Sequence, residues 1–219
     1  MIIIFDCDGV LRSASWEGLY KAYIKLIEAQ GKEPYDFFTD MKSFKLWWNP
    51  DWHRNNEKLG LPLYKTDEID TIFHEVYDSY IHLFDWVPEI ICELYCKHLL
   101  ALLTSSAESS VRKFLDGSNK YFDCIVGCER VKKLKPHPEG IHKIMRNFPE
   151  VSEEEFILVG DMTVDIQAGK NAGIRTGAVS WGFGEKEELL SLSPDMFFAA
   201  PQDLLKIGKE GANNGKRGC

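Results

Sequence analysis

The chain has 219 residues, of which 44% are hydrophobic, so it is long enough for one domain with a substantial core and an insertion. Its net charge of -8 at pH 7 argues against nucleic acid as a partner. No apolar run reaches the ~18 residues of a membrane span, and the start resembles no signal peptide, so we expect a soluble, cytoplasmic protein without a membrane partner.

The first predicted element is a short buried strand that ends in two aspartates. Residues 2–5 form a continuous apolar run, which is typical of a strand buried on both faces of a parallel sheet. Asp6 and Asp8 follow it, and Gly9 comes next. An Asp-Gly turn alone explains Asp8 but leaves the charge of Asp6 without a partner near the edge of the sheet. A bound divalent cation explains both carboxylates.

Residues 12–84 differ from the rest of the chain and are predicted to form an all-helical insertion. Apolar side chains recur at helical spacing in 16–27 and in 69–81, and no convincing buried strand lies between these segments. The intervening stretch 47–54 is rich in tryptophan and in turn residues. We expect its tryptophans to pack in a hydrophobic core, with a ligand cage as the alternative.

After residue 84, predicted strands and helices alternate. Buried strands are expected at 99–103, 122–126, 156–159 and 174–180, with a short edge strand at 196–198. Helices are expected between them, and a last helical turn or two at 202–207. This alternation predicts an α/β fold with a doubly wound parallel sheet of Rossmann type. Residues 208–219, rich in Gly, Lys and Asn, are predicted to be a disordered tail.

Polar side chains follow the predicted strands at the points where these strands end. Asp6, Thr104 and Asp161 each come directly after a strand, and Lys135 lies in a proline-containing loop before a helix. Parallel sheets bind ligands at the carboxyl ends of their strands, so we expect these groups in one crevice. Clustered carboxylates favour Mg²⁺ over zinc as the bound ion. A phosphate bound in the same crevice would contact the ammonium of Lys135 and the hydroxyl of Thr104. One aspartate is then placed to attack phosphorus, and a second to act as acid and base.

These residues lie in four short motifs, which are Asp6-Cys7-Asp8-Gly9-Val10, Thr104, Lys135-Pro-His-Pro and Gly160-Asp161-x-x-x-Asp165. In this order and spacing they resemble the four motifs of the haloacid dehalogenase-like (HAD) hydrolase superfamily. The stretch Trp181-Gly182-Phe183-Gly184 resembles its phosphoglycolate phosphatase-like branch. The resemblance implies the HAD-like strand order 3-2-1-4-5. It also implies a catalytic core made of residues 1–11 and 85–207, and a helical cap at 12–84 that closes over the site.

The resemblance also implies roles for the motif residues. Asp6 is implied as nucleophile and magnesium ligand. Asp8 is implied as general acid and base, with its backbone carbonyl on the metal. Thr104 is implied to hold the phosphoryl group, and Lys135 to balance its charge.

Four further residues complete the implied site. Asp161 and Asp165 are implied as metal ligands, with Asp165 in or just behind the shell. Gly9 and Ser105 are implied beside the bound phosphate. Ser105 stands where the family often has Asn, a change that leaves the chemistry in place.

Arg12 is a departure from the family pattern, because Arg12-Ser13 replaces the common acidic-Ser pair after the first motif. We hypothesise that its guanidinium fork binds a carboxylate or a second phosphate of the substrate. The alternative is a solvated linker residue.

The motifs predict a magnesium-dependent phosphatase that hydrolyses a small phosphorylated metabolite through an aspartyl-phosphate, as a monomer or homodimer. A phosphomutase of the β-phosphoglucomutase type shares every motif residue and stays open as an alternative. A catalytically silent binding module usually lacks a motif residue, and none is missing here. A dehalogenase would leave Asp8 and the metal carboxylates idle, since halide needs no proton as it leaves.

Overall fold

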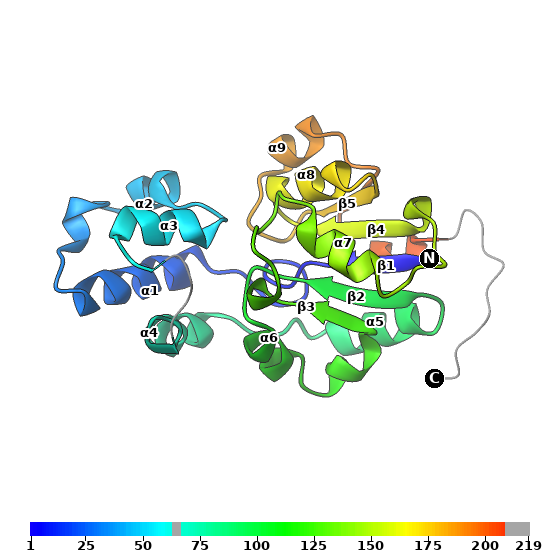
Figure 1. Ribbon diagram of the computed structural model, residues 1–219, viewed down its shortest axis with the longest axis horizontal. Coiled ribbons are helices and arrows are strands. Elements are labelled where there is room, and N and C mark those ends of the chain that lie inside the picture. The colour runs from blue at the N-terminus through cyan, green and yellow to red at the C-terminus, as the bar shows by residue number, and fades with distance from the viewer. Residues whose placement is uncertain (63–66, 209–219) are drawn as a thin grey trace. The chain divides into compact units, whose positions relative to one another are not determined.

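The computed structural model describes residues 1–62 and 67–208, and its elements are labelled in Figure 1. The chain divides into two compact units, Met1–Ser13 with Leu83–Cys219 and Ala14–His82. The predicted tail, 208–219, lies outside the described residues except for Gly208. No helix in the described ranges has both the length and the apolar character that crossing a bilayer requires.

The first unit contains one parallel sheet of six strands in the order β3-β2-β1-β4-β5-β6. The strands are β1 (Ile2–Phe5), β2 (Leu99–Leu103), β3 (Cys124–Val126), β4 (Phe156–Gly160), β5 (Arg175–Val179) and β6 (Met196–Phe198). The predicted fold class and strand order are therefore confirmed. β3 begins two residues later than the predicted strand 122–126, because the Asp123 carboxylate accepts the Leu100 N–H at 3.0 Å in place of a strand carbonyl.

Helices cover both faces of this sheet (Figure 1). Ile3 and Phe5 of β1 join one hydrophobic cluster, and Ile2 and Ile4 join another, because successive side chains of a strand point to opposite faces. The helices that pack on the first cluster are α5 (Val87–Tyr95) and α6 (Glu108–Leu115), and those on the second are α7 (Glu139–Met145) and α8 (Thr163–Asn171). All four β1 side chains are fully buried, which explains their continuous apolar run.

Two further elements lie near the end of this unit. Helix α9 (Lys186–Ser191) buries Leu189 against Ile166 of α8. The predicted last helical turn at 202–207 is a 3₁₀ helix, Pro201–Lys206, which buries Leu204 in the first cluster.

The described part of the second unit contains helices and no strand, as predicted. The helices are α1 (Trp16–Ala29), α2 (Met41–Trp47), α3 (Trp52–Leu59) and α4 (Asp67–Tyr77). Side-chain oxygens of Ser15, Asp40 and Asp51 accept backbone N–H groups at the starts of the first three. The buried Phe44 ring lies within 6.4 Å of five aromatic rings, those of Trp16, Tyr20, Tyr23, Phe38 and Trp47. Of the tryptophans in 47–54, Trp47 therefore packs on the core of the unit, as expected.

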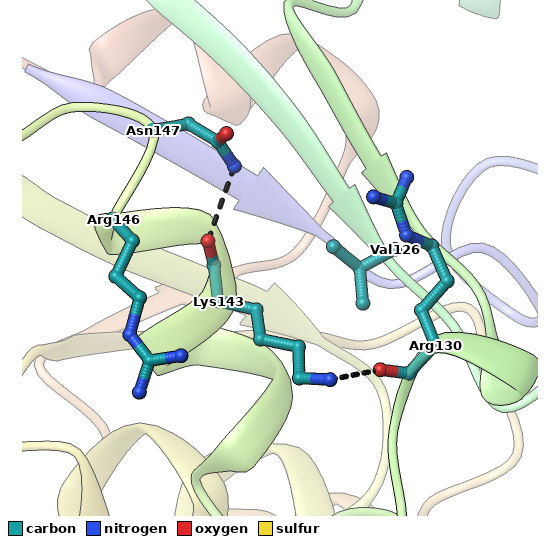
Figure 2. Close-up of a pocket in the computed structure, with 5 residues that line it drawn as sticks. All are labelled: Val126, Arg130, Lys143, Arg146 and Asn147. Atoms are coloured by element: carbon teal, nitrogen blue, oxygen red, sulfur yellow. Dashed lines mark hydrogen bonds between the residues drawn. The ribbon is translucent and has the colours of Figure 1, made fainter.

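A hollow of about 350 Å³ lies beside β3, at the open edge of the sheet (Figure 2). Its lining residues are Val126, Arg130, Lys143, Arg146 and Asn147. The Arg130 guanidinium donates to the Ile125 carbonyl at 3.5 Å, and the Lys143 ammonium donates to the Arg130 carbonyl. Cationic side chains that cover an edge strand protect it from pairing with another chain. We therefore infer that the cationic side chains that line this hollow protect the open edge of the sheet.

Replacing Phe44 by Ala should lower the free energy of unfolding of the helical unit by about 3–5 kcal/mol, the usual cost of emptying a buried aromatic site. Urea unfolding followed by tryptophan fluorescence measures this loss, because Trp16 and Trp47 contact the ring. Leu46→Ala on the same helix is the control, since Leu46 is 82% exposed, and should change stability by less than about 0.5 kcal/mol. Equal losses in the two variants would contradict the assignment of Phe44 to the core.

Candidate active site

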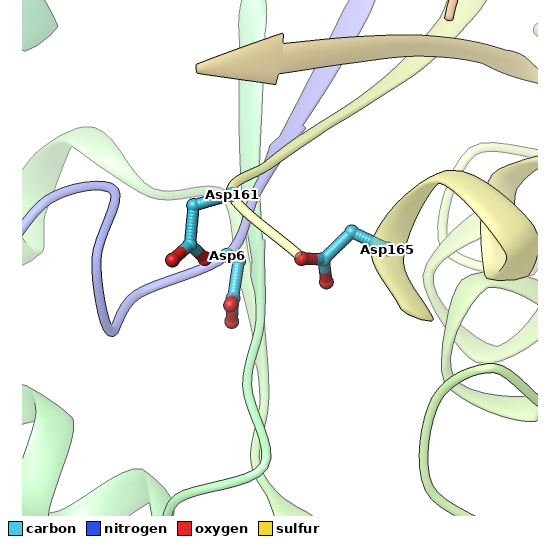
Figure 3. A group of neighbouring side chains, drawn as sticks. All are labelled: Asp6, Asp161 and Asp165. Atoms are coloured by element: carbon cyan, nitrogen blue, oxygen red, sulfur yellow. The ribbon is translucent and has the colours of Figure 1, made fainter. Parts of the chain in front are cut away.

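Three buried carboxylates meet at the carboxyl edge of the sheet (Figure 3). Asp6 follows β1, Asp161 follows β4, and Asp165 lies in the first turn of α8. None of them is more than 7% exposed, and one oxygen of each lies within 4.8 Å of the others. The structure thus brings together three of the predicted metal ligands as a group that can hold a metal ion.

Lys135 lies among these carboxylates. Its Nζ is 2.8 Å from Asp6 Oδ1 and 2.6 Å from Asp165 Oδ1, and it donates to the Leu103 carbonyl at 3.5 Å. The lysine comes from the loop before α7, and it is only 6% exposed. One buried ammonium therefore faces three buried carboxylates, which leaves the cluster short of positive charge.

The pKa values of the cluster reflect this imbalance. Burial raises the pKa of Asp6 to about 7, although Lys135 opposes the shift. Burial, then the charges of Asp165 and Asp6, raise the pKa of Asp161 well above its ordinary value. Burial lowers the pKa of Lys135, but the two neighbouring carboxylates outweigh burial and raise it overall. A cation bound at Asp161 would favour the ionised form of each acid.

Asp161 is oriented by the stretch that follows β5. The Phe183 N–H donates to Asp161 Oδ2 at 2.6 Å, and the Gly184 N–H donates to the Asp161 carbonyl at 3.2 Å. A Cβ at Gly182 or at Gly9 would lie 2.2 Å from Asp161 Oδ2, so only glycine permits this approach. Within the described residues, Asp161 Oδ1 is buried and has no hydrogen-bond partner. This oxygen is available to a bound cation.

Sequence reasoning noted the 181–184 stretch only as a family resemblance and missed its contact with Asp161. The donor is a backbone N–H, that of Phe183, which no side-chain pattern marks. The only available signal was the pair of glycines on either side of Phe183.

Asp8 and Arg12 form a second part of the site. Arg12 Nε lies 2.7 Å from Asp8 Oδ1, and Arg12 Nη2 donates to Asp8 Oδ2 at 3.0 Å. Burial raises the pKa of Asp8, but the charge and hydrogen bonds of Arg12 and the hydrogen bond of Ser106 hold it below its ordinary value. The Arg12 side chain is fully buried, so the alternative of a solvated linker residue is wrong. Its fork, predicted to bind a substrate anion, holds Asp8 here.

The remaining predicted residues lie around this core. Thr104 is 2% exposed, and its hydroxyl oxygen accepts the Ser106 N–H at 3.0 Å. Thr104 and Ser105 line the same small cavity as Lys135. Gly9 has φ of +79°, a conformation that favours glycine, and its N–H donates to the Arg12 carbonyl at 2.8 Å. Ser106, which sequence reasoning did not select, is marked only by its place two residues after Thr104.

Together, the fold and the site define an α/β enzyme with a nucleophile candidate and a carboxylate cluster at the carboxyl edge of a doubly wound sheet. The chain belongs to the haloacid dehalogenase-like hydrolase family, whose model matches residues 3–179. The family and the enzyme class predicted from the motifs are thereby confirmed, and the protein is a hydrolase.

Relatives resemble the chain over nearly its whole length. It is 31% identical over 212 residues to pyrophosphatase PpaX of Bacillus cereus strain B4264, covering 94% of each protein. A haloacid dehalogenase-like family hydrolase from Streptococcus pneumoniae has a TM-score of 0.70 and 24% identity, covering 94% of this chain and 96% of its own. A Thermotoga maritima protein provisionally described as a β-phosphoglucomutase has a TM-score of 0.67 and 26% identity, covering 96% of this chain and 99% of its own.

Asp161→Asn should raise the free energy of unfolding of the metal-free protein by about 1–2 kcal/mol near pH 8. The substitution removes one of three crowded like charges, while the amide oxygen can still accept the Phe183 N–H. Thermal unfolding of both proteins in a chelator measures the gain. A variant that unfolds at a lower temperature than the parent would contradict the charge imbalance.

The stability that Asp161→Asn gains over the parent protein should shrink as the pH falls. The folded-state pKa of Asp6 is raised to about 7 from an ordinary value of 3.8, so between these values the folded protein binds more protons than the unfolded chain. The parent protein therefore gains stability from Asp6 as the pH falls through 7 toward 4, and its repulsion of Asp161 is relieved. The same melts, repeated from about pH 8 to about pH 5, test the sign.

Proposed function

We propose that the protein is a magnesium-dependent phosphatase that hydrolyses a small phosphate monoester through an aspartyl-phosphate intermediate. The observation that carries this proposal is the cluster of Asp6, Asp161 and Asp165 around Lys135 at the carboxyl edge of the sheet. Buried oxygen ligands and a lysine suit a hard cation together with a phosphate dianion. The relatives named pyrophosphatase PpaX support phosphate transfer to water as the reaction.

The residues fit a magnesium ion. All candidate ligands are oxygens, the group is short of positive charge, and Asp161 Oδ1 is buried without a hydrogen-bond partner among the described residues. We assign Asp6 and Asp161 as side-chain ligands, Asp8 through its backbone carbonyl, and Asp165 in or just behind the shell. When bound, the ion would neutralise the substrate phosphate and favour the ionised form of Asp6.

In the first step Asp6 is the nucleophile and Asp8 is the acid. A carboxylate oxygen of Asp6 attacks phosphorus, and the bond between phosphorus and the ester oxygen breaks. The leaving oxygen takes a proton from the protonated form of Asp8, which the lowered pKa makes a stronger acid. This transfer gives the free alcohol, an aspartyl-phosphate at Asp6 and the Asp8 carboxylate. Attack needs the ionised form of Asp6, which Lys135 favours at 2.8 Å.

In the second step Asp8 is the base. It removes a proton from a water molecule as the water oxygen attacks phosphorus. The bond between phosphorus and Asp6 breaks, which releases phosphate and restores both aspartates. Arg12 favours the carboxylate form of Asp8 that this step requires.

The remaining residues are assigned to substrate binding. Thr104 and Ser105 hold the phosphoryl group with Lys135, and the Gly9 turn permits the backbone to approach it. The helical insertion predicted at 12–84 is proposed to act as a cap that excludes water. We further propose that the substrate is a small phosphorylated metabolite, that the protein is cytoplasmic, and that it is a monomer or a homodimer.

Two candidate reactions follow from the relatives. The PpaX relatives make inorganic pyrophosphate a candidate substrate beside small phosphate esters. The Thermotoga maritima protein keeps a phosphomutase as the alternative, since that reaction uses the same motif residues. Phosphate release and sugar-phosphate isomerisation, assayed side by side over a panel of phosphorylated metabolites, separate the two reactions and identify the substrate.

Asp6→Asn should abolish phosphate release from p-nitrophenyl phosphate, because the amide is a poor nucleophile for phosphorus. In the parent protein a chelator should stop the same reaction and Mg²⁺ should restore it. Asp123→Asn serves as the control, since Asp123 binds the Leu100 backbone and lies outside the carboxylate cluster. Turnover that continues in the chelator would contradict the magnesium dependence.

Asp8→Ala should cut turnover most for esters with poor leaving groups. An alkoxide is a strong base that needs a proton as it leaves, a service worth about 10²–10⁴-fold, whereas p-nitrophenolate leaves readily without one. The ratio of kcat for p-nitrophenyl phosphate to kcat for ethyl phosphate should therefore rise by about 10²-fold or more. A variant that hydrolyses ethyl phosphate at the parent rate would show that Asp8 is not the acid.

A further inference from the structure

Arg12 contacts both carboxylate oxygens of Asp8, the residue proposed to act as acid and then as base. Nε lies 2.7 Å from Oδ1 of Asp8, and Nη2 lies 3.0 Å from Oδ2. A guanidinium bound in this way fixes the plane and the rotation of a carboxylate, which a single ammonium does not. The pairing therefore restricts the orientation of Asp8 as well as its charge.

Ser106 closes a three-membered network with this pair. Its hydroxyl accepts from Arg12 Nη2 at 3.0 Å and donates to Asp8 Oδ2 at 3.0 Å, so one donor and one acceptor position are both used. The Ser106 N–H donates to the Thr104 hydroxyl oxygen at 3.0 Å. The network thus connects the orientation of Asp8 to the loop that carries the proposed phosphate-binding residue.

Arg12 is itself held rigidly. Its side chain is fully buried, and its guanidinium carbon lies 4.8 Å from the centre of the Phe114 ring. Its N–H donates to the Cys7 carbonyl at 3.1 Å, and its carbonyl accepts the Gly9 N–H at 2.8 Å. A buried guanidinium is costly unless it is paired, so its interaction with Asp8 defines the local geometry.

We propose that Arg12 and Ser106 are positioning residues that hold the carboxyl group of Asp8 in the orientation needed for proton transfer to the leaving group. The inference rests on the proposed function, in which Asp8 gives that proton. Arg12 then binds the catalytic acid, Asp8, and not an anionic group of the substrate, because the guanidinium fork that would bind such a group already binds Asp8.

The test compares Arg12→Lys, which keeps the charge and loses the fork, with Ser106→Ala. For each full-length variant, kcat and KM are measured with p-nitrophenyl phosphate and with ethyl phosphate. Misplacement of Asp8 should lower kcat for ethyl phosphate about 10- to 100-fold more than kcat for p-nitrophenyl phosphate, with KM little changed. Ser106→Ala should act in the same direction with a smaller effect, about three- to tenfold, since it removes one hydrogen bond to Asp8 and one from Arg12 but leaves both Arg12 contacts to Asp8 in place.

A matched control comes from α6. Arg112 binds Glu108 at the same four-residue spacing, through Nε at 2.9 Å and Nη2 at 2.7 Å, and its side chain is 48% exposed. Arg112→Lys should leave the ratio of the two kcat values unchanged. In an Asp8→Ala background, Arg12→Lys should also leave the ratio unchanged, because there is no carboxylate left to orient.

Four results would overturn the inference. Arg12→Lys with the parent kcat on both esters would show that charge alone suffices, and an equal loss of kcat on both esters would show a merely structural role. A change of ratio that persists in the Asp8→Ala background would show that Arg12 acts elsewhere. Where Arg12→Lys fails to fold, Ser106→Ala decides, and an unchanged ratio in it counts against the inference. A parent protein without phosphatase activity would instead refute the proposed function.

Discussion

Three buried carboxylates share one ammonium group at the carboxyl edge of the sheet, and this shortage of positive charge constrains the rest of the site. Lys135 lies 2.8 Å from Asp6 and 2.6 Å from Asp165, whereas Asp161 depends on a backbone N–H. Burial disfavours the ionised form of each acid more than the single ammonium favours it, so Asp6 and Asp161 have raised pKa values. The metal-free protein is therefore less stable than its packing alone would make it, and binding of a cation would offset that cost.

The backbone around Asp161 is built to keep that carboxylate in place. Gly9 and Gly182 come so close that a Cβ on either would lie 2.2 Å from Asp161 Oδ2. The peptide that brings Gly182 there also brings the Phe183 N–H, which determines which of the two oxygens stays open. Close approach of bare backbone lets one buried acid be held by dipoles on one side while its other side remains available to a ligand.

Asp6 and Asp8 are two residues apart and have opposite environments. The pKa of Asp6 is raised to about 7, since burial outweighs Lys135, while Arg12 and Ser106 hold the pKa of Asp8 below its ordinary value. Two carboxylates whose environments separate their pKa values in this way are typical of active sites that need a different task from each. The two pKa values differ because Asp6 shares Lys135 with Asp165, whereas Asp8 is paired with Arg12.

The sequence by itself determined the sheet and most of the carboxylate cluster. A continuous apolar run marks a strand buried on both faces, and parallel strands end at a common edge, so the placement of Asp6 beside Asp161 follows from local patterns and a general rule. Only the tertiary structure decided the environment of Arg12. Its contact with Ser106 spans 94 residues, and its burial depends on a ring from α6, that of Phe114. Such contacts arise from packing between distant segments, which no local pattern records.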